Sequence, residues 1–337
     1  MKAGSIAVVG AGSWGTALAL QFARSGLRVN IWGRDRAQLE SMARDRVNAR
    51  YLPGASLPEN VVTFTELREC VADVRDILIS VPSHGLRQIL TAVKPFLQHD
   101  ARVCWATKGF ELHTGKLPHE VAAEVLGAEQ PVAVLSGPTF AKEVGEGLPT
   151  AMTIAANDQT FAQELAVALS GDYFRAYTSD DMIGVEVGGA IKNVLAIGAG
   201  MSDGLGFGAN TRIALITRGL VEMTRLGVAL GAKKETFMGL AGMGDLILTC
   251  TDNLSRNRRM GLALASGKTV EEAQTEIQQV VEGVMAAEAV IEVANELGIE
   301  MPICHQVYRI LYEGASPREA VGALMSRQLK SESDSAT

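Results

Sequence analysis

Short apolar runs alternate with segments of helical periodicity through the first half of the chain. Runs of strand length lie at residues 5–10, 28–33, 76–81, 102–109, 131–138, 149–156 and 174–179. The helical segments between them include residues 14–26, which end on a glycine suited to a helix C-terminus. Strands that are apolar throughout and separated by helices indicate a mostly parallel sheet covered on both faces.

The pattern changes after Ser179, where strand-like runs stop. Helical periodicity covers residues 191–201, 211–230, 256–266, 284–297 and 306–312. The sequence therefore predicts an α/β protein with a doubly wound, mostly parallel sheet, followed by an all-helical C-terminal domain. We place the first domain at residues 1–179 and the second at 180–330, and we expect the polar tail, 331–337, to be flexible.

Composition excludes several classes of protein. The 337 residues are 47% hydrophobic and carry a net charge of −7, which argues against a broad basic surface and a nucleic-acid partner. The four cysteines have no metal-binding spacing, so we expect buried thiols in a reducing compartment and no metal. The apolar N-terminal run leads into a glycine motif rather than a signal-peptide cleavage site, and Glu186 and Lys192 interrupt the longest apolar run. We expect a cytoplasmic protein without a membrane span.

The sequence "GAGSWG" places Gly10, Gly12 and Gly15 directly between a predicted strand and a predicted helix. In this context the first glycine allows a tight turn, the second lets a pyrophosphate approach the backbone, and the third lets helix and strand pack closely. N–H groups at the helix start then bind the phosphates. The first domain is therefore predicted to be Rossmann-like and to bind a dinucleotide.

The end of the second predicted strand favours one type of dinucleotide. NAD-binding versions carry an acidic residue there, whereas this chain has Gly33 and Arg34. A cation suits the 2′-phosphate of NADP(H), so we expect NADPH to be favoured over NADH. Two alternatives stay open. Asp35 could bind the ribose of NAD(H), or Arg34 and the nearby Arg36 could be solvated loop residues.

Several polar segments predict a second ligand. Lys108 ends one predicted strand, and Gly137 and Thr139 end another, at the edge where doubly wound sheets bind ligands. A glycine-rich segment carries Asp245 and leads to Ser255, Arg256 and Asn257 at a predicted helix start. Cations at a helix start oppose the helix dipole, and a bound phosphate would remove that conflict. An exposed basic first turn is the alternative.

Lys192 is the one basic residue in the apolar run 184–201. Burial disfavours the charge of a lysine and suits it to accept or donate a proton. The alternative is a lysine whose tip reaches solvent at a domain edge. Asn193 beside it could hold a substrate hydroxyl or a cofactor amide. His84, in "SVPSHG", is either a cofactor contact or a loop histidine.

Together these segments resemble the bacterial NAD(P)-dependent glycerol-3-phosphate dehydrogenases over nearly the whole chain. The resemblance rests on "VVGAGSWGTALA", "ATKGF", "LSGPTFAKEV", "GGAIKNVLAIGAG", "AGMGDLILTCT", "SRNR" and "VVEGV". It implies reduction of dihydroxyacetone phosphate to sn-glycerol 3-phosphate for phospholipid synthesis, a Rossmann-like domain followed by a helical domain, and a homodimer. It also implies that Lys192 is the proton acceptor in the oxidative direction.

The resemblance also implies roles for individual residues. Cofactor contacts are expected from Ser13, Trp14, Arg34, Tyr51, Lys108, Ala141, Arg256, Val280 and Glu282. Substrate contacts are expected from Lys108, Gly137, Thr139, Lys192, Asp245, Ser255, Arg256 and Asn257. Two other functions stay open, a β-hydroxyacid dehydrogenase of the 6-phosphogluconate type and a non-catalytic NADP(H)-sensing protein.

Overall fold

The computed structural model describes residues 4–328 and 331, so most of the expected tail 331–337 lies outside the described residues. The chain divides into two compact units. The first unit comprises Met1–Lys108 and Pro118–Met182, and the second comprises Gly109–Leu117 and Ile183–Thr337. The sequence pattern does not indicate that residues 109–117 belong to the second unit, whose core receives Phe110 and Leu117 from this segment.

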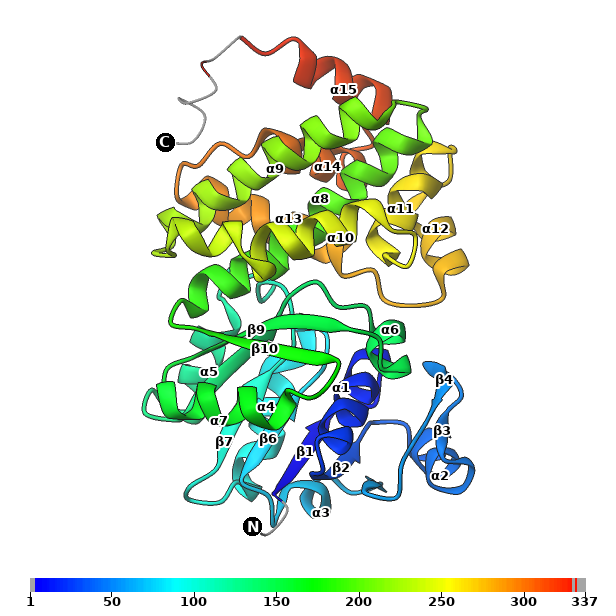
Figure 1. Cartoon of the computed structure of the whole chain (residues 1–337). Helices are drawn as coiled ribbons and strands as arrows, with labels where there is room; N and C mark the ends of the chain where they lie inside the picture. The colour runs from blue at the N-terminus through cyan, green and yellow to red at the C-terminus, as the bar shows by residue number, and fades with distance from the viewer. Residues whose placement is uncertain (1–3, 329–330, 332–337) are drawn as a thin grey trace. The chain divides into compact units, whose positions relative to one another are not determined.

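The first unit is built on an eight-stranded sheet with the order β10-β9-β8-β7-β6-β1-β2-β5 (Figure 1). All neighbouring strands are parallel except β8 and β9. This confirms the predicted mostly parallel sheet. The strands are β1 (Ser5–Val9), β2 (Arg28–Trp32), β5 (Val61–Phe64), β6 (Asp76–Ile79), β7 (Arg102–Trp105), β8 (Val132–Ser136), β9 (Thr150–Ala156) and β10 (Phe174–Ser179).

The strand order reverses at β1, which lies between β2 and β6. Right-handed crossovers on either side of a reversal place their helices on opposite faces of the sheet. One set contains α1 (Ser13–Arg24), α6 (Ala141–Glu146) and α7 (Gln159–Leu169), and the other contains α3 (Leu67–Val71), α4 (Leu86–Val93) and α5 (Pro118–Leu126). A crevice for ligands is expected where the order reverses, and the glycine motif follows β1.

The apolar pattern misses three strands of the first unit. β5 is only four residues long, and β3 (Val47–Asn48) pairs with β4 (Leu52–Ser56) in a small antiparallel hairpin. β4 reads "LPGAS", whose proline and glycine are typical of a turn rather than a strand. The hairpin follows α2 (Arg36–Asp45), which ends at Arg46 in the left-handed conformation.

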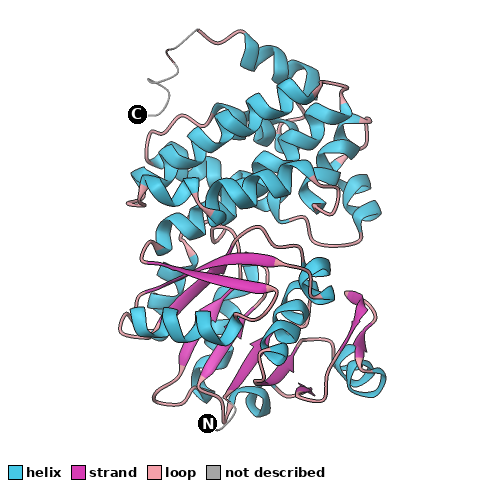
Figure 2. Ribbon diagram, viewed as in Figure 1, coloured by secondary structure: helices cyan, strands magenta, loops and turns pink. Residues whose placement is uncertain are grey.

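Helices are the only regular secondary structure among the described residues of the second unit, and strands occur in the first unit alone (Figure 2). Its α-helices are α8 (Met182–Gly204), α9 (Ala209–Ala229), α10 (Asp245–Thr251), α11 (Arg256–Ala265), α12 (Val270–Ile277), α13 (Glu282–Glu296), α14 (Pro302–Tyr312) and α15 (Pro317–Met325). The predicted helical C-terminal fold is confirmed, although the sequence pattern predicts no helix at α10, α12 or α15.

α8 lies in the centre of the second unit's core. It is long and apolar enough to cross a membrane, yet 89% of its most apolar window is buried inside the protein, as in the core helix of a globular unit. Glycines let α8 meet its neighbours closely: a Cβ on Gly200 would lie 2.1 Å from the carbonyl oxygen of Arg258 in α11. Helix α11 is therefore fixed against α8 by direct backbone packing.

Candidate active site

The glycine motif forms a tight turn between β1 and α1. Gly10 has a φ of +129°, and a Cβ there would lie 2.2 Å from the carbonyl oxygen of Ser80. A Cβ on Gly15 would lie 1.8 Å from the carbonyl oxygen of Gly10. Both positions therefore require glycine, for the turn and for the packing of α1 on the sheet.

The start of α1 fits a dinucleotide phosphate. A Cβ on Gly12 would have no neighbour within 4 Å, so the backbone is open to a ligand at that point. No acidic residue lies in the first turn, whose N–H groups have no acceptor within the helix. The Nε1 of Trp14 is buried and has no hydrogen-bond acceptor among the described residues. An unsatisfied buried donor beside a phosphate-binding helix start is consistent with a cofactor contact.

The residues after β2 differ in what they already bind. Asp35 is the N-cap of α2 and accepts from Gln38 N at 3.1 Å, while its other oxygen lies 3.3 Å from Arg50. Arg36 pairs with Glu40 at 3.0 Å. Arg34 is exposed, and no ion pair involves it in the described part of the chain. Arg34 is thus the cation available to a ligand, whereas Asp35 is engaged with protein groups.

Lys108 and the segment after β8 lie at the ends of neighbouring strands. Lys108 is three residues beyond the end of β7, which pairs with β8. Gly137 has a φ of +149°, and a Cβ there would lie 2.9 Å from the Cα of Met152, so the turn requires glycine. Thr139 is half-buried and Ala141 begins α6. The Oγ of Ser136 is buried without a partner among the described residues, a signal that the sequence pattern did not reveal.

Lys192 is buried, and its partner is Asp245. The lysine is 7% exposed and Asp245 is 1% exposed, and the Nζ lies 2.5 Å from the Oδ1 of Asp245. The Nζ also donates to the Oγ1 of Thr249 at 3.1 Å, and this hydroxyl donates to the carbonyl oxygen of Asp245 at 2.6 Å. The structure therefore excludes a lysine whose tip lies in solvent. Thr249 is a member of this cluster that no local sequence pattern indicates.

A close backbone contact explains why Asp245 reaches Lys192. A Cβ on Gly188 of α8 would lie 2.4 Å from the carbonyl oxygen of Ala241. Ala241 belongs to a single π-helical turn, η4 (Leu240–Gly244), which leads directly into α10 at Asp245. Gly188 and Lys192 are four residues apart and share one face of α8. The glycine therefore brings the π-turn against α8, and π-turns are frequent at functional sites.

The start of α11 carries three of the predicted substrate residues. Ser255 is its N-cap, and the hydroxyl accepts from Arg258 N at 3.2 Å. Arg256 is half-buried and makes no ion pair in the described part of the chain. The first turn holds no acidic residue. A ten-residue helix that begins with a hydroxyl cap and unpaired arginine can bind an anion.

Two asparagines connect this helix start to α8 and α13. Asn257 Nδ2 donates to Asn193 Oδ1 at 2.8 Å, and Asn257 Oδ1 accepts from Gly283 N at 2.9 Å. Both asparagine side chains are buried. The three helices are thus held in register next to Lys192, because Asn193 follows it directly in the chain.

The remaining predicted residues lie in exposed or half-buried positions. Glu282 begins α13 and is half-buried, while Val280 is 45% exposed. Tyr51 is half-buried in the turn between β3 and β4. His84 is exposed in a short 3-10 segment after β6.

The cysteines play no visible part in this chemistry. All four are buried and free, which confirms the expected buried thiols. Burial raises the pKa of the Cys250 thiol to about 12, so it stays protonated near neutral pH although it lies on α10 with Asp245. No group of three His, Cys, Asp or Glu residues that could hold a metal occurs among residues 4–328.

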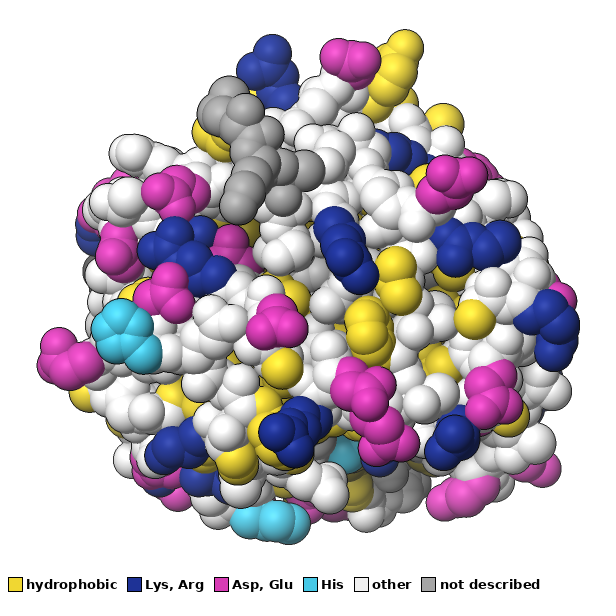
Figure 3. All heavy atoms as spheres, turned by 90° about the horizontal axis from the view of Figure 1, so that it is seen from below, with side chains coloured by type: hydrophobic (Ala, Val, Ile, Leu, Met, Phe, Trp, Pro, Cys, Tyr) yellow, Lys and Arg dark blue, Asp and Glu magenta, His cyan; other side chains and the backbone are white. Residues whose placement is uncertain are grey.

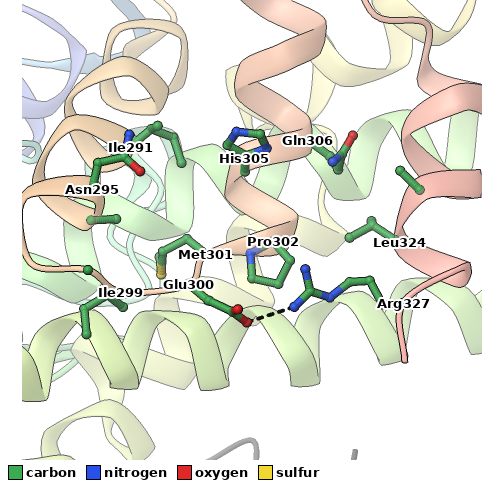
Figure 4. Close-up of a pocket in the computed structure, with 13 residues that line it drawn as sticks. Ile291, Asn295, Ile299, Glu300, Met301, Pro302, His305, Gln306, Leu324 and Arg327 are labelled. Atoms are coloured by element: carbon green, nitrogen blue, oxygen red, sulfur yellow. Dashed lines mark hydrogen bonds and ion pairs between the residues drawn. The ribbon is translucent and has the colours of Figure 1, made fainter. Parts of the chain in front are cut away.

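A cavity of about 370 Å³ lies elsewhere in the second unit (Figure 4). It is lined by the end of α13 and by residues of α14 and α15, and Arg327 pairs with Glu300 at its edge at 2.9 Å. None of the predicted site residues lines it. Figure 3 shows acidic and basic side chains interspersed on one face of the protein, without a broad basic patch among the residues drawn.

Comparison with known proteins assigns the family. Two family models match, the N-terminus of NAD-dependent glycerol-3-phosphate dehydrogenase at residues 5–162 and its C-terminus at residues 181–322. An NAD(P)+ glycerol-3-phosphate dehydrogenase of Aliivibrio fischeri is 54% identical over 330 residues, which cover 98% of this chain and 96% of that protein. One from Cronobacter sakazakii is 54% identical and covers 98% of both chains.

A solved structure agrees with these sequence matches. The crystal structure of glycerol-3-phosphate dehydrogenase from Coxiella burnetii superposes with a TM-score of 0.94 at 48% identity, over 96% of this chain and 99% of that chain. Its likeness extends over both the sheet-containing unit and the helical unit. The chain belongs to the NAD-dependent glycerol-3-phosphate dehydrogenase family.

Proposed function

We propose that the chain catalyses the reversible reduction of dihydroxyacetone phosphate to sn-glycerol 3-phosphate with NADPH or NADH, which supplies glycerol phosphate for phospholipid synthesis. The observation that carries the proposal is the buried Lys192–Asp245 pair at 2.5 Å in the second unit. Family membership favours this reaction over the β-hydroxyacid dehydrogenase and the NADP(H)-sensing protein, and a sensing protein would have no use for a buried proton donor.

Lys192 is the proposed acid in reduction and the base in oxidation. When bound, the reduced nicotinamide supplies the hydride that adds to C2 of dihydroxyacetone phosphate. The Nζ of Lys192 donates a proton to the oxygen on C2 as its negative charge develops. Asp245 and Thr249 hold the ammonium group in place through the contacts described above, so it is oriented before the substrate binds.

The start of α11 is the proposed site for the substrate phosphate. Arg256 supplies the charge, and the N–H groups of the first turn supply donors near Ser255 and Asn257. The side chain of Asn257 is already engaged with Asn193 and Gly283, so we assign its substrate contact to the backbone N–H. Lys108, Gly137 and Thr139 are further proposed substrate residues, and for these the support is the family resemblance.

Residues 1–179 are the proposed cofactor-binding domain, apart from 109–117, which belong to the second unit, and residues 180–330 are the proposed substrate domain. Gly10, Gly12, Ser13, Trp14 and Gly15 would hold the pyrophosphate at the start of α1. Arg34 would bind a 2′-phosphate, which supports a preference for NADPH, because Asp35 is engaged in capping α2. Tyr51, Lys108, Ala141, Arg256, Val280 and Glu282 are the other proposed cofactor contacts.

The proposal includes a cytoplasmic homodimer that needs no metal and has no membrane span. The family resemblance, the buried free cysteines and the burial of α8 support this part of the proposal. Gel filtration with light scattering would measure the assembly state directly.

The decisive experiment follows the absorbance of the reduced nicotinamide. Purified protein with NADPH should oxidise it when dihydroxyacetone phosphate is added, and sn-glycerol 3-phosphate with NADP+ should reverse the signal. No turnover in either direction, by folded protein with either nucleotide, would reject the function. A reaction with 6-phosphogluconate or another β-hydroxyacid instead would identify the alternative enzyme.

A matched pair of arginines tests the phosphate site. Arg256→Gln should raise KM for dihydroxyacetone phosphate by about 10- to 100-fold, the loss expected for a charge-assisted contact. Arg259 lies three residues further along α11 and is exposed, so Arg259→Gln removes the same charge from the same helix. An equal rise in KM for both variants would assign the effect to general surface charge.

A further inference from the structure

A second arginine contacts the residue that follows Arg34, the proposed 2′-phosphate residue. Arg50 Nη1 is 3.3 Å from the Oδ2 of Asp35, the residue that follows Arg34 in the chain. The guanidinium carbon of Arg50 also lies over the ring of Tyr51, 5.1 Å from its centroid. Two arginines and an aromatic ring therefore gather at the end of β2 and the turn of the β3–β4 hairpin. Guanidinium groups suit an adenosine 2′-phosphate because they bind phosphate. They also pair with aromatic faces, as Arg50 does with the ring of Tyr51.

The turn that carries Arg50 is fixed to the glycine motif. Asn48 is fully buried, and its Nδ2 donates to the carbonyl oxygen of Ala11 at 3.0 Å and to the Oγ1 of Thr16 at 2.8 Å. The Oδ1 of Asn48 accepts from Tyr51 N at 3.3 Å. Gln38 Nε2 of α2 donates to the same Ala11 carbonyl at 2.7 Å. The hairpin turn, α2 and the proposed pyrophosphate loop therefore form one hydrogen-bonded structure.

Stability alone does not explain the contact between Arg50 and Asp35. The two side chains are 64% and 45% exposed, and an ion pair in that environment contributes little to folding. The Arg50–Asp35 ion pair has a larger effect on the binding of a charged ligand than on folding. A carboxylate beside a 2′-phosphate repels the phosphate, and Asp35 is compensated on one oxygen by the N-terminus of α2 and on the other by Arg50.

We propose that Arg50 is a specificity-determining residue that contacts the 2′-phosphate of NADP(H) together with Arg34. This inference rests on the proposed dehydrogenase function and goes beyond the residues that the family resemblance implies. A long, exposed side chain loses only a weak ion pair when it turns from Asp35 to a phosphate dianion, and it gains a charge-assisted contact in exchange.

The test compares nucleotides that differ by one phosphate. Calorimetry measures binding of adenosine 2′,5′-bisphosphate and of 5′-AMP to the parent protein and to Arg50→Gln. We expect the dissociation constant of the bisphosphate to rise about 10-fold in the variant, the lower end of a charge-assisted contact because the site is exposed. The constant for 5′-AMP should change less than twofold. The ratio of kcat/KM for NADPH to that for NADH should fall by a similar factor.

Arg36→Gln is the matched control, because Arg36 lies on the same surface but is paired with Glu40. The double variant Asp35→Asn/Arg50→Gln separates direct contact from charge compensation. If Arg50 contacts the phosphate directly, the double variant should bind the bisphosphate as weakly as Arg50→Gln does. Recovery of bisphosphate affinity in the double variant would overturn the proposal. The proposal also fails if Arg50→Gln binds the bisphosphate as the parent does, or if Arg36→Gln loses as much affinity. Absence of dehydrogenase activity in the parent would reject the proposed function separately, because the binding measurements need no turnover.

Discussion

Lys192 and Asp245 share a buried environment in which each compensates the charge of the other. Lys192→Met keeps length and apolar packing but deletes the transferable proton, so kcat should fall by about 10²- to 10⁴-fold in both directions. The affinity for NADPH, measured by fluorescence, should change only a few-fold, because the proposed cofactor contacts lie mainly in the first unit. A folded variant with half of the parent rate would contradict the proposed acid, and Lys108 would become the leading candidate.

The same substitution removes the charge that lies 2.5 Å from the buried Asp245 carboxylate. Removal of one member of a buried pair typically costs about 3–5 kcal/mol, so Lys192→Met should lower the free energy of unfolding strongly. The double variant Lys192→Met/Asp245→Asn removes both charges and should recover part of that loss while remaining inactive. Chemical denaturation of the three proteins measures this coupling and separates the catalytic loss from a loss of folding.

At the scale of elements, the start of α11 has both a structural and a proposed binding role. Ser255→Ala removes an N-cap and should cost about 1 kcal/mol of stability. Thr269 caps α12 through a capping box, so Thr269→Ala removes a cap of the same kind elsewhere in the second unit. We expect similar stability losses and a raised KM for dihydroxyacetone phosphate in Ser255→Ala alone. A raised KM in both variants would mean that loosening of the unit, rather than the site, is measured.

Glu222 caps α14 from a buried position on α9. Its two carboxylate oxygens accept from Ile303 N at 2.7 Å and from Cys304 N at 3.1 Å, and burial raises the pKa of Glu222 to about 7. A carboxyl whose pKa is raised on folding adds stability that is fully present below its unfolded pKa. That stability, about 3 kcal/mol for a shift of this size, is lost as pH rises from about 4.5 to 7.

Glu222→Gln cannot ionise, so the parent should lose stability relative to this variant across that pH window. Denaturation at several pH values from 4.5 to 7.5 measures the slope. Glu292→Gln, at an exposed position of α13, is the matched control and should keep the slope of the parent. An unchanged slope in Glu222→Gln would show that this carboxyl does not titrate in the window.

What the sequence could reveal depended on how far apart interacting residues lie in the chain. The glycine motif was predictable because Gly10, Gly12 and Gly15 act within one turn, and the start of α11 because its cap is local. Thr249 was missed because its partner Lys192 lies 57 residues away. Asn48 was missed because its contact with Thr16 spans 32 residues, and a lone asparagine carries no pattern.

At the scale of the whole molecule, each unit has a hydrophobic core of its own. One core cluster contains Phe22, Ile31 and Leu165, and the other contains Ile191, Met223 and Val290. The strand and helix patterns indicated both cores, whereas residues 109–117 join the second core through Phe110 and Leu117, a long-range packing that no local pattern encodes. Separate cores predict that heat unfolds the protein in two transitions.

Cofactor binding identifies which transition belongs to which unit. NADPH at about 100 times its dissociation constant stabilises the state that binds it by about 2.7 kcal/mol. This corresponds to a rise in Tm of roughly 5–10 °C for a unit of this size. Because the glycine motif and most of the proposed cofactor contacts lie in the first unit, NADPH should raise the transition of that unit much more than the other. Glu222→Ala orphans two backbone donors at α14 in the second unit, so it should lower mainly the transition that NADPH raises less. Differential scanning calorimetry resolves both shifts, and a single transition that responds to both changes would show that the two units unfold together.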